Sequence, residues 1–279
     1  MSREDQPSRP DPALEAASRL WAHDTRYIPF YVLDVGTGAP SRISGRRLLQ
    51  TARQGRVAGL VLTQQSDDGV RTLTLNRARK KNALSIDLRD EMSDALDAAG
   101  HDDGVKVVVV TGAGDTFSAG FDLKEFDDLD DEAHARRLWA SSDRWHRTLI
   151  ELPLPILAAV NGPALAGGFD LAVMCDVRIA ATTARFAHPE QAFSDVVYGP
   201  LHDLVGGAVA RDLCLTGRSV DAEEALALRL VSKVVAPEDL EHETRDTASR
   251  ISRAPRDILV RTKAKAIRRA AISGPTLDL

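Results

Sequence analysis

Apolar and polar residues alternate in blocks along residues 57–160, and their spacing predicts strands and helices in turn. Two strand-like runs, 57–63 and 70–75, flank Asp67-Asp68-Gly69, whose turn residues predict a hairpin. Ser85 is a favourable N-cap for the helix that follows. The apolar residues of that helix fall on one face at helical spacing: Leu88, Met92, Ala95, Leu96 and Ala99.

The next blocks complete an α/β pattern. The run 105–111 is continuous and rich in valine, which is typical of a buried parallel strand. A helix is predicted for 132–150, ended by Pro153 and Pro155, and 156–160 indicates another buried strand. Such alternation favours an α/β fold with right-handed crossovers. After residue 190 the pattern is largely helical, with a short strand predicted at 230–235 and two final helices.

The N-terminal segment is harder to interpret. Residues 1–12 are polar and rich in proline, so we expect them to be disordered. The stretch 32–40 has the strand and glycines that begin some nucleotide sites, but Pro40 replaces the third glycine and no clear helix follows. An ordinary strand and turn is the favoured interpretation.

Composition limits the class of protein. The 279 residues are 43% hydrophobic and 28% charged, as expected of a soluble globular chain. The net charge of −5 does not predict nucleic-acid binding. The sequence contains no run long enough to span a membrane and its N-terminus is too polar for a secretory signal, so a cytoplasmic location is expected. Cys175 and Cys214 are expected to be buried thiols.

A small-residue turn is the most informative stretch. The run 156–160 leads into Ala166-Gly167-Gly168, where a substrate can approach the backbone closely. If a helix begins here, its first N–H groups have no partner within the helix and can bind an anion or a carbonyl oxygen that becomes negative. A tight, closely packed turn explains the glycines equally well. A second small-residue loop, 116–123, also follows a buried strand, and one N–H from each loop would make an oxyanion hole.

Two acids lie near this turn in the sequence. Asp170 and Glu190 each have apolar neighbours, and carboxylates that share a pocket have their pKa values pushed apart, so that one acts as a base while the other holds a proton. His188 is more simply a structural histidine. Tyr198 and His202 are further polar candidates. The spacing of His, Cys and Asp does not match a metal site, so no metal is expected.

Taken together, these residues resemble the crotonase superfamily of enoyl-CoA hydratases and isomerases. The resemblance covers roughly residues 57–270 and depends on several blocks in order, which include 75–84, 110–112, 117–124, 158–162, 166–168, 174–176, 215–218 and 230–235. It implies a spiral of ββα units (57–215), a C-terminal helical trimerisation region (216–279) and an N-terminal extension (1–56) outside the family pattern. It also implies homotrimers or hexamers, an acyl-CoA thioester substrate and no cofactor beyond the CoA of that substrate.

The resemblance also assigns residues to roles. Phe121 and Gly167 would supply the oxyanion-hole N–H groups, and Asp170 and Glu190 correspond to the two catalytic acids of hydratases. The CoA groove would be lined by Lys80, Ala83, Ala119, Asp122 and Leu123. Basic residues near the C-terminus are candidates for CoA phosphates, although a solvated helix face explains them too: Arg261, Lys263, Lys265, Arg268 and Arg269.

Two departures from the family pattern keep alternatives open. Asp170 stands where hydratases carry Glu and is shorter by about 1.5 Å. The segment 197–203 replaces a usual Pro-Gly turn, so Tyr198 or His202 could enter the acyl pocket. Hydration of a 2-enoyl-CoA is the leading hypothesis. Double-bond isomerisation ranks second, hydrolysis or carbon–carbon cleavage of an unusual acyl-CoA third, and a non-catalytic CoA-binding homologue is less favoured.

Overall fold

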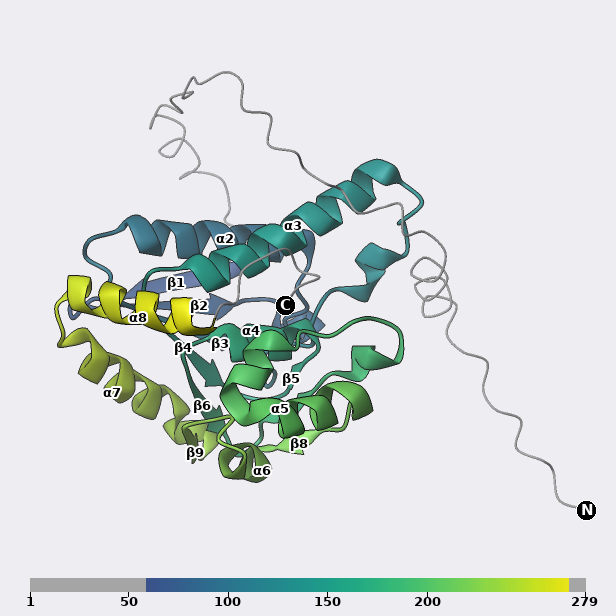
Figure 1. Cartoon of the computed structure of the whole chain (residues 1–279). Helices are drawn as coiled ribbons and strands as arrows, with labels where there is room; N and C mark the ends of the chain where they lie inside the picture. Colours follow the sequence, from purple (N-terminus) through teal and green to yellow (C-terminus); the bar gives the residue numbers. More distant parts are fainter. Residues whose placement is uncertain (1–58, 271–279) are drawn as a thin grey trace, which may run out of the picture.

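A computed structural model describes residues 59–270 of the chain (Figure 1). The N-terminal extension, its stretch 32–40 and the last nine residues lie outside this range. The expectations for them therefore stay predictions.

The predicted hairpin opens the described chain. Strands β1 (Val61–Gln65) and β2 (Val70–Leu75) pair antiparallel. Gly69 in their turn has φ +85°, a conformation that glycine adopts without strain. Helix α2 (Ile86–His101) follows, and Ser85 caps it by accepting a hydrogen bond from the Leu88 N–H. The sequence predicted both the turn and this cap.

A six-stranded sheet forms the centre of the molecule, in the order β1-β2-β3-β4-β6-β9. After the first hairpin every neighbouring pair is parallel. The remaining strands of this sheet are β3 (Val107–Gly112), β4 (Ile156–Val160), β6 (Val177–Ala181) and β9 (Lys233–Val235). The short strand predicted at 230–235 is therefore present, but begins at Lys233.

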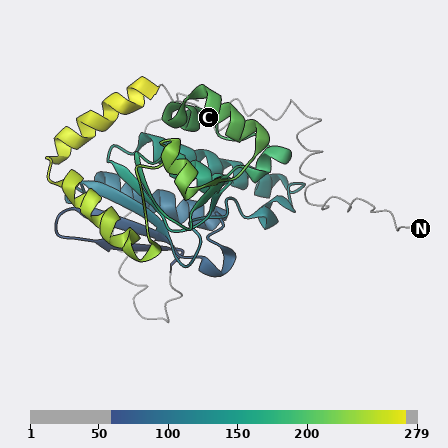
Figure 2. The same ribbon diagram turned by 90° about the horizontal axis from the view of Figure 1, so that it is seen from below.

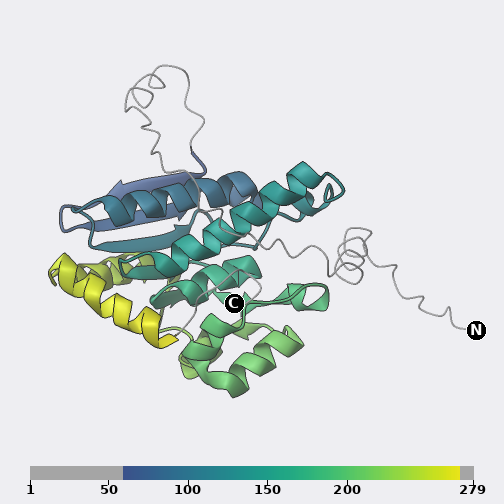
Figure 3. The same cartoon turned by 45° about the horizontal axis from the view of Figure 1, so that its top comes forward.

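The four valines of β3 show why this strand has no polar face. Val108 and Val110 pack into the cluster that includes the apolar face of α2, whereas Val107 and Val109 pack with Leu240 and Ala248 of helix α7 (Leu240–Ser252). Helices thus cover both faces of the sheet. Figure 3 shows α2 and helix α3 (Glu132–Glu151) side by side over one of these faces.

A second, three-stranded sheet has the order β5-β7-β8 and consists of β5 (Ala164–Leu165), β7 (Arg185–Ala187) and β8 (Val220–Asp221). Ser118, in the loop after β3, adds an isolated parallel bridge to Ala164. Two successive turns, β4-β5-α4 and β6-β7-α5, each give one strand to the large sheet and a short one to the small sheet before a helix. This repetition is the predicted ββα spiral.

The other helices complete the fold. They are α4 (Gly167–Met174), α5 (Gly199–Thr216, kinked at Gly206), α6 (Ala222–Ala227) and α8 (Arg256–Ala270), with short 3₁₀ turns η1 (Ala78–Lys80), η2 (Leu123–Phe126), η3 (Pro189–Ala192) and η4 (Pro237–Asp239). Helices α7 and α8 form one flank of the molecule (Figures 1 and 2). Within residues 59–270, no helix is long and apolar enough to cross a membrane.

Lys263 anchors α8 to the body of the protein. Its buried ammonium group lies 2.9 Å from Asp176 Oδ2 and donates a hydrogen bond to the Leu154 carbonyl oxygen at 2.8 Å. The expectation that Lys263 is available to a CoA phosphate is therefore wrong, because folding uses its charge inside the protein. Arg261 is likewise paired, with Asp257 at 2.9 Å.

We expect Lys263→Ala to lower the free energy of unfolding by about 1–3 kcal/mol, because the Leu154 carbonyl and Asp176 lose a buried donor. Urea denaturation followed by circular dichroism measures this change. Lys265→Ala on the exposed side of α8 is the matched control and should change stability by less than about 0.5 kcal/mol. Equal stability of the two variants would contradict the anchoring role.

Candidate active site

The glycine turn lies between β5 and α4. Ala166 precedes the helix with φ +51° and ψ −131°, a conformation that costs energy for a residue with a Cβ and is often found at functional sites. Its carbonyl oxygen accepts the N–H groups of Phe169 and Asp170, which closes the first turn of α4. The N–H of Gly167 donates no hydrogen bond to any residue in 59–270. The predicted free donor at a helix start is therefore present.

The second loop holds Phe121 against Leu84. Leu84 makes an isolated parallel bridge to Phe121: its N–H bonds the Gly120 carbonyl at 2.8 Å, and its carbonyl accepts the Asp122 N–H at 3.4 Å. In such a bridge the N–H of the central residue points away from the partner. The Phe121 N–H accordingly has no acceptor among the described residues.

The two loops touch one another. A Cβ placed on Gly120 would lie 3.0 Å from the Gly167 nitrogen, and one placed on Gly167 would lie 2.8 Å from Cδ1 of Phe121. Only glycine fits at either position without displacing its neighbour. The two unpartnered N–H groups thus occur on loops in direct contact, as an oxyanion hole requires.

Pairing in the small sheet brings the two acids together. Parallel strands β5 and β7 place Leu165 opposite Ala187, and the Ala166 N–H bonds the Ala187 carbonyl at 2.9 Å. Asp170 follows β5 in the first turn of α4, and Glu190 follows β7 in η3. Twenty residues of sequence separation therefore become one site.

His188 lies between the carboxylates and is fully buried. Its Nδ1 is 3.0 Å from Glu190 Oε1 and 3.7 Å from Asp170 Oδ1. The ring packs on Phe169 with centroids 4.6 Å apart. Asp170 Oδ1 and Glu190 Oε2 are buried and make no hydrogen bond within the described part of the chain, so both keep unused acceptor capacity. The shorter Asp170 side chain still reaches the cluster.

The environment sets the protonation of these groups. Burial raises the pKa of Asp170 to about 7, with a further increase from the negative charge of Glu190, although His188 opposes it. Burial lowers the pKa of His188, but its hydrogen bond with Glu190 and the charges of both acids outweigh burial, so the net shift is upward. Asp170 is therefore the acid that can hold a proton near neutral pH.

One imidazole and two carboxylates could also hold a cation, since their donor atoms lie within 4.8 Å of one another. The spacing in the sequence had not indicated this cluster. The 3.0 Å contact between His188 Nδ1 and Glu190 Oε1 already pairs two members of this cluster by a direct hydrogen bond.

The residues expected to line the CoA groove follow two adjoining segments. The Ala119 N–H bonds the Lys81 carbonyl at 2.9 Å, which joins the loop of Lys80 and Ala83 to the loop of Ala119. Leu123 is 59% exposed and Lys80 is exposed, as a rim for a ligand would be. Asp122 is bound to Arg77 at 2.8 Å and also caps η2. Its carboxylate is therefore engaged within the protein.

In the altered segment before α5, Tyr198 and His202 lie in different environments. Tyr198 is half-buried and packs against the core, with its ring 5.6 Å from that of His202. The His202 side chain is 47% exposed and lies 3.5 Å from Asp203. Cys214 is buried. Burial and the negative charges of Asp170 and Glu190 raise the pKa of its thiol to about 11. Both cysteines are free, buried thiols, as predicted.

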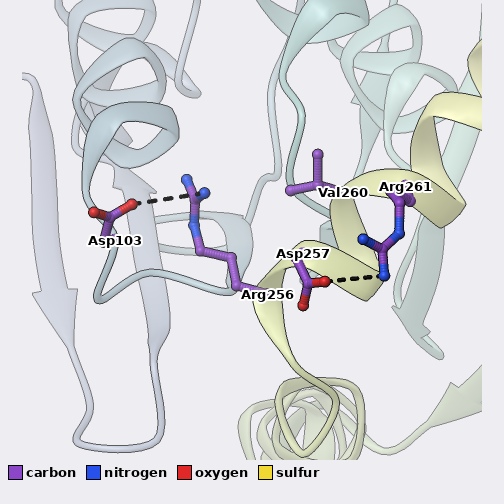
Figure 4. Close-up of a pocket in the computed structure, with 5 residues that line it drawn as sticks. All are labelled: Asp103, Arg256, Asp257, Val260 and Arg261. Atoms are coloured by element: carbon purple, nitrogen blue, oxygen red, sulfur yellow. Dashed lines mark ion pairs between the residues drawn. The ribbon is translucent and has the colours of Figure 1, made fainter.

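A surface depression of about 520 Å³ lies apart from these groups, at the start of α8 (Figure 4). Its charged side chains face one another: Arg256 lies 3.9 Å from Asp103 and Arg261 lies 2.9 Å from Asp257. It offers no free acid or base, so the acid cluster remains the candidate site.

Sequence reasoning underestimated His188 and missed Arg77 and Arg89, which contact site loops. The two-residue spacing of His188 and Glu190 was the available signal for the first. A charged residue inside a helix gives no sign that it is buried, so Arg89 could not be recognised in this way.

Known proteins are similar to this chain over most of its length. The family model described as Enoyl-CoA hydratase/isomerase matches residues 65–276. The chain is similar to a short-chain-enoyl-CoA hydratase of Clostridium acetobutylicum, 36% identical over 211 residues that cover 74% of this chain and 80% of that protein.

Solved structures are similar over most of the chain. An enoyl-CoA hydratase from Bacillus anthracis superposes with a TM-score of 0.72 at 30% identity, covering 77% of this chain and 84% of that one. A monofunctional enoyl CoA isomerase from M. smegmatis gives a TM-score of 0.66 at 32% identity, covering 78% and 96%.

Proposed function

Because the chain belongs to the enoyl-CoA hydratase/isomerase family, within the crotonase superfamily, we propose that it hydrates the double bond of a 2-enoyl-CoA. The observation that carries this proposal is the meeting of two unpartnered backbone N–H groups, on Phe121 and Gly167, with the acid pair Asp170 and Glu190 beside the same glycine turn.

The thioester oxygen would accept hydrogen bonds from the Phe121 and Gly167 N–H groups. These donors stabilise the enolate that forms when water adds to Cβ, and removing one oxyanion donor typically costs about a hundredfold or more in rate. Because both are backbone groups fixed by neighbouring bonds, they need no rearrangement during the reaction.

The acid pair would divide the proton transfers. Glu190 removes a proton from water through its free Oε2 while the water oxygen bonds to Cβ. Neutral Asp170 then gives its proton to Cα of the enolate, and the proton on Glu190 returns to Asp170 to restore the starting state. The sum is addition of one water molecule, with both new bonds formed on the face that the acids share.

Isomerisation is the second candidate, since the same enolate needs only one base. Its support is the similarity to the mycobacterial isomerase and the direct hydrogen bond between His188 and Glu190, which orients that single acid. No contact among the described site residues favours hydrolysis or carbon–carbon cleavage over these two reactions. A non-catalytic role does not explain why two buried acids converge on free N–H donors.

A substrate comparison tests the proposal. Purified protein is incubated with crotonyl-CoA, a 3-enoyl-CoA and an aromatic acyl-CoA, and the products are separated by chromatography. Formation of 3-hydroxybutyryl-CoA as the fastest reaction supports hydration. Faster conversion of the 3-enoyl-CoA to its 2-enoyl isomer, with little hydration, would replace the leading proposal with the second.

We further infer that the CoA part of the substrate lies along Lys80, Ala83, Ala119, Asp122 and Leu123, and that no other organic group or metal takes part. A homotrimer or hexamer is proposed from the family and from exposed apolar residues of the C-terminal half, such as Leu215 and Ile258. Sedimentation of the purified chain would measure its assembly state.

A further inference from the structure

Arg89 of α2 is a charged side chain with no solvent exposure. A buried charge persists only when its donors are satisfied. Arg89 NH1 donates to the Leu84 carbonyl at 2.6 Å, NH2 to the Leu138 carbonyl at 3.3 Å and Nε to Ser141 Oγ at 3.3 Å. Burial lowers the pKa of Arg89 to about 10, so it remains a cation at neutral pH.

The shortest of these bonds reaches the peptide that holds Phe121. Leu84 clamps the Phe121 peptide through both its N–H, to Gly120, and its carbonyl, from the Asp122 N–H. That carbonyl is the one to which Arg89 donates. Arg89 therefore fixes the group that determines the direction of the Phe121 N–H.

Arg89 also contacts the Phe121 side chain. Its guanidinium carbon lies 4.3 Å from the centroid of the Phe121 ring, in a cation–π arrangement. The edge of the same ring borders Gly167, where an added Cβ would come within 2.8 Å of it. Arg89 thus contacts the Phe121 ring directly and the Phe121 backbone through Leu84. The edge of the ring packs against the glycine turn.

We propose that Arg89 is a positioning residue of the oxyanion hole, which holds the Phe121 N–H in the orientation needed to bind the thioester oxygen. This inference rests on the proposed function, because it requires that the Phe121 N–H binds substrate. Arg89 touches no reacting atom; it acts through Leu84 and the Phe121 ring.

A planar fork is needed for this role. Arginine reaches Leu84, Leu138 and Ser141 at once from one rigid group, whereas the single ammonium of lysine cannot span the same three acceptors and stacks less well on a ring. A shift of about 1 Å in a catalytic group can cost roughly a hundredfold in rate. Arg89→Lys and Arg89→Met should therefore lower kcat by about tenfold to a hundredfold and leave KM nearly unchanged.

The test measures polarisation of a bound thioester directly. Hexa-2,4-dienoyl-CoA is bound to the Glu190→Gln protein, which turns it over slowly, and the shift of its absorption maximum to longer wavelength reports hydrogen bonding to the thioester oxygen. The shift should be reduced when Arg89→Met or Arg89→Lys is added. Ser141→Ala, which removes one partner of Arg89, should reduce it by a smaller amount and provides a variant if the others fold poorly.

Lys263→Ala in the same background is the control, because it also removes a buried cation but one whose partners, Leu154 and Asp176, lie outside the oxyanion loops, and it should leave the shift unchanged. An unshifted spectrum with Glu190→Gln alone would overturn the oxyanion hole itself, and with it the proposed function. A normal shift there that persists in every folded Arg89 and Ser141 variant, with unchanged kcat, would overturn only the role of Arg89.

Discussion

Replacing Glu190 with Gln is expected to lower kcat for hydration by about 10²–10⁴-fold, the usual contribution of a general base. Gln keeps the shape of the side chain and can still accept a hydrogen bond from His188, but its amide cannot remove a proton from water. The oxyanion donors are backbone groups and remain in place, so KM for the acyl-CoA should change little. Both candidate reactions depend on this base, and both should fall together.

The rates are measured on crotonyl-CoA and a 3-enoyl-CoA at saturating concentrations. Glu241→Gln on the exposed side of α7 is the matched control and should retain full activity. The affinity for the acyl-CoA product is measured separately by titration, as a measure of binding that does not depend on turnover. Turnover within about threefold of the parent protein, below the smallest effect expected of a base, would remove Glu190 from the mechanism.

Replacing Asp170 with Asn is expected to have the second large effect. The substitution distinguishes hydration from isomerisation, because the two reactions should be slowed by different amounts. Hydration needs two proton-transfer groups and should fall by about 10²–10⁴-fold. Isomerisation uses Glu190 alone and should be much less affected. If both activities survive in Asp170→Asn, the acid pair does not cooperate and the proposal of hydration through Asp170 is wrong.

The pH dependence of the same variant gives an independent measure. Asp170 must be protonated to donate to Cα, and its pKa is about 7, so hydration by the parent protein should decline as pH rises through about 7. The residual activity of Asp170→Asn should lack this decline. Because the acids are coupled, the measured midpoint belongs to the pair rather than to Asp170 alone.

At high pH, Asp170→Asn should raise the free energy of unfolding although it lowers the rate of hydration. The folded-state pKa of Asp170 is raised above the unfolded value, so its contribution to stability is complete below about pH 4 and is lost as pH rises through about 7. Asn does not titrate. Asp170→Asn should therefore be more stable than the parent protein at pH 8, measured by urea denaturation, while hydrating more slowly.

Local patterns were sufficient to predict most of the fold. The β-branched run around β3 and the Ser85 cap, which accepts the Leu88 N–H at 3.3 Å, depend on neighbours in sequence and were both predicted. The bounds of β9 were less accurate because Leu230 instead bonds back to Ala225 at the end of α6. Strand ends depend on partners, which a single sequence does not show.

The site was predicted only in part, for a related reason. The glycine turn and the two acids stood out by residue type, and the chemistry of a free N–H at a helix start is local. The burial of His188 between the acids depends on two short strands whose paired residues are 22 positions apart, and that of Lys263 on a partner 87 positions earlier, at Asp176. Neither pairing leaves a periodic signal.

The short second sheet has a consequence for how the protein acquires activity during folding. Its strands are two or three residues long and come from three separate turns of the spiral, so they gain little from local pairing. Contacts between distant segments form late because loop closure must precede them. The large sheet and α2 can assemble before β5 pairs with β7. A refolding chain would therefore regain its helical circular dichroism earlier than its enzymatic activity.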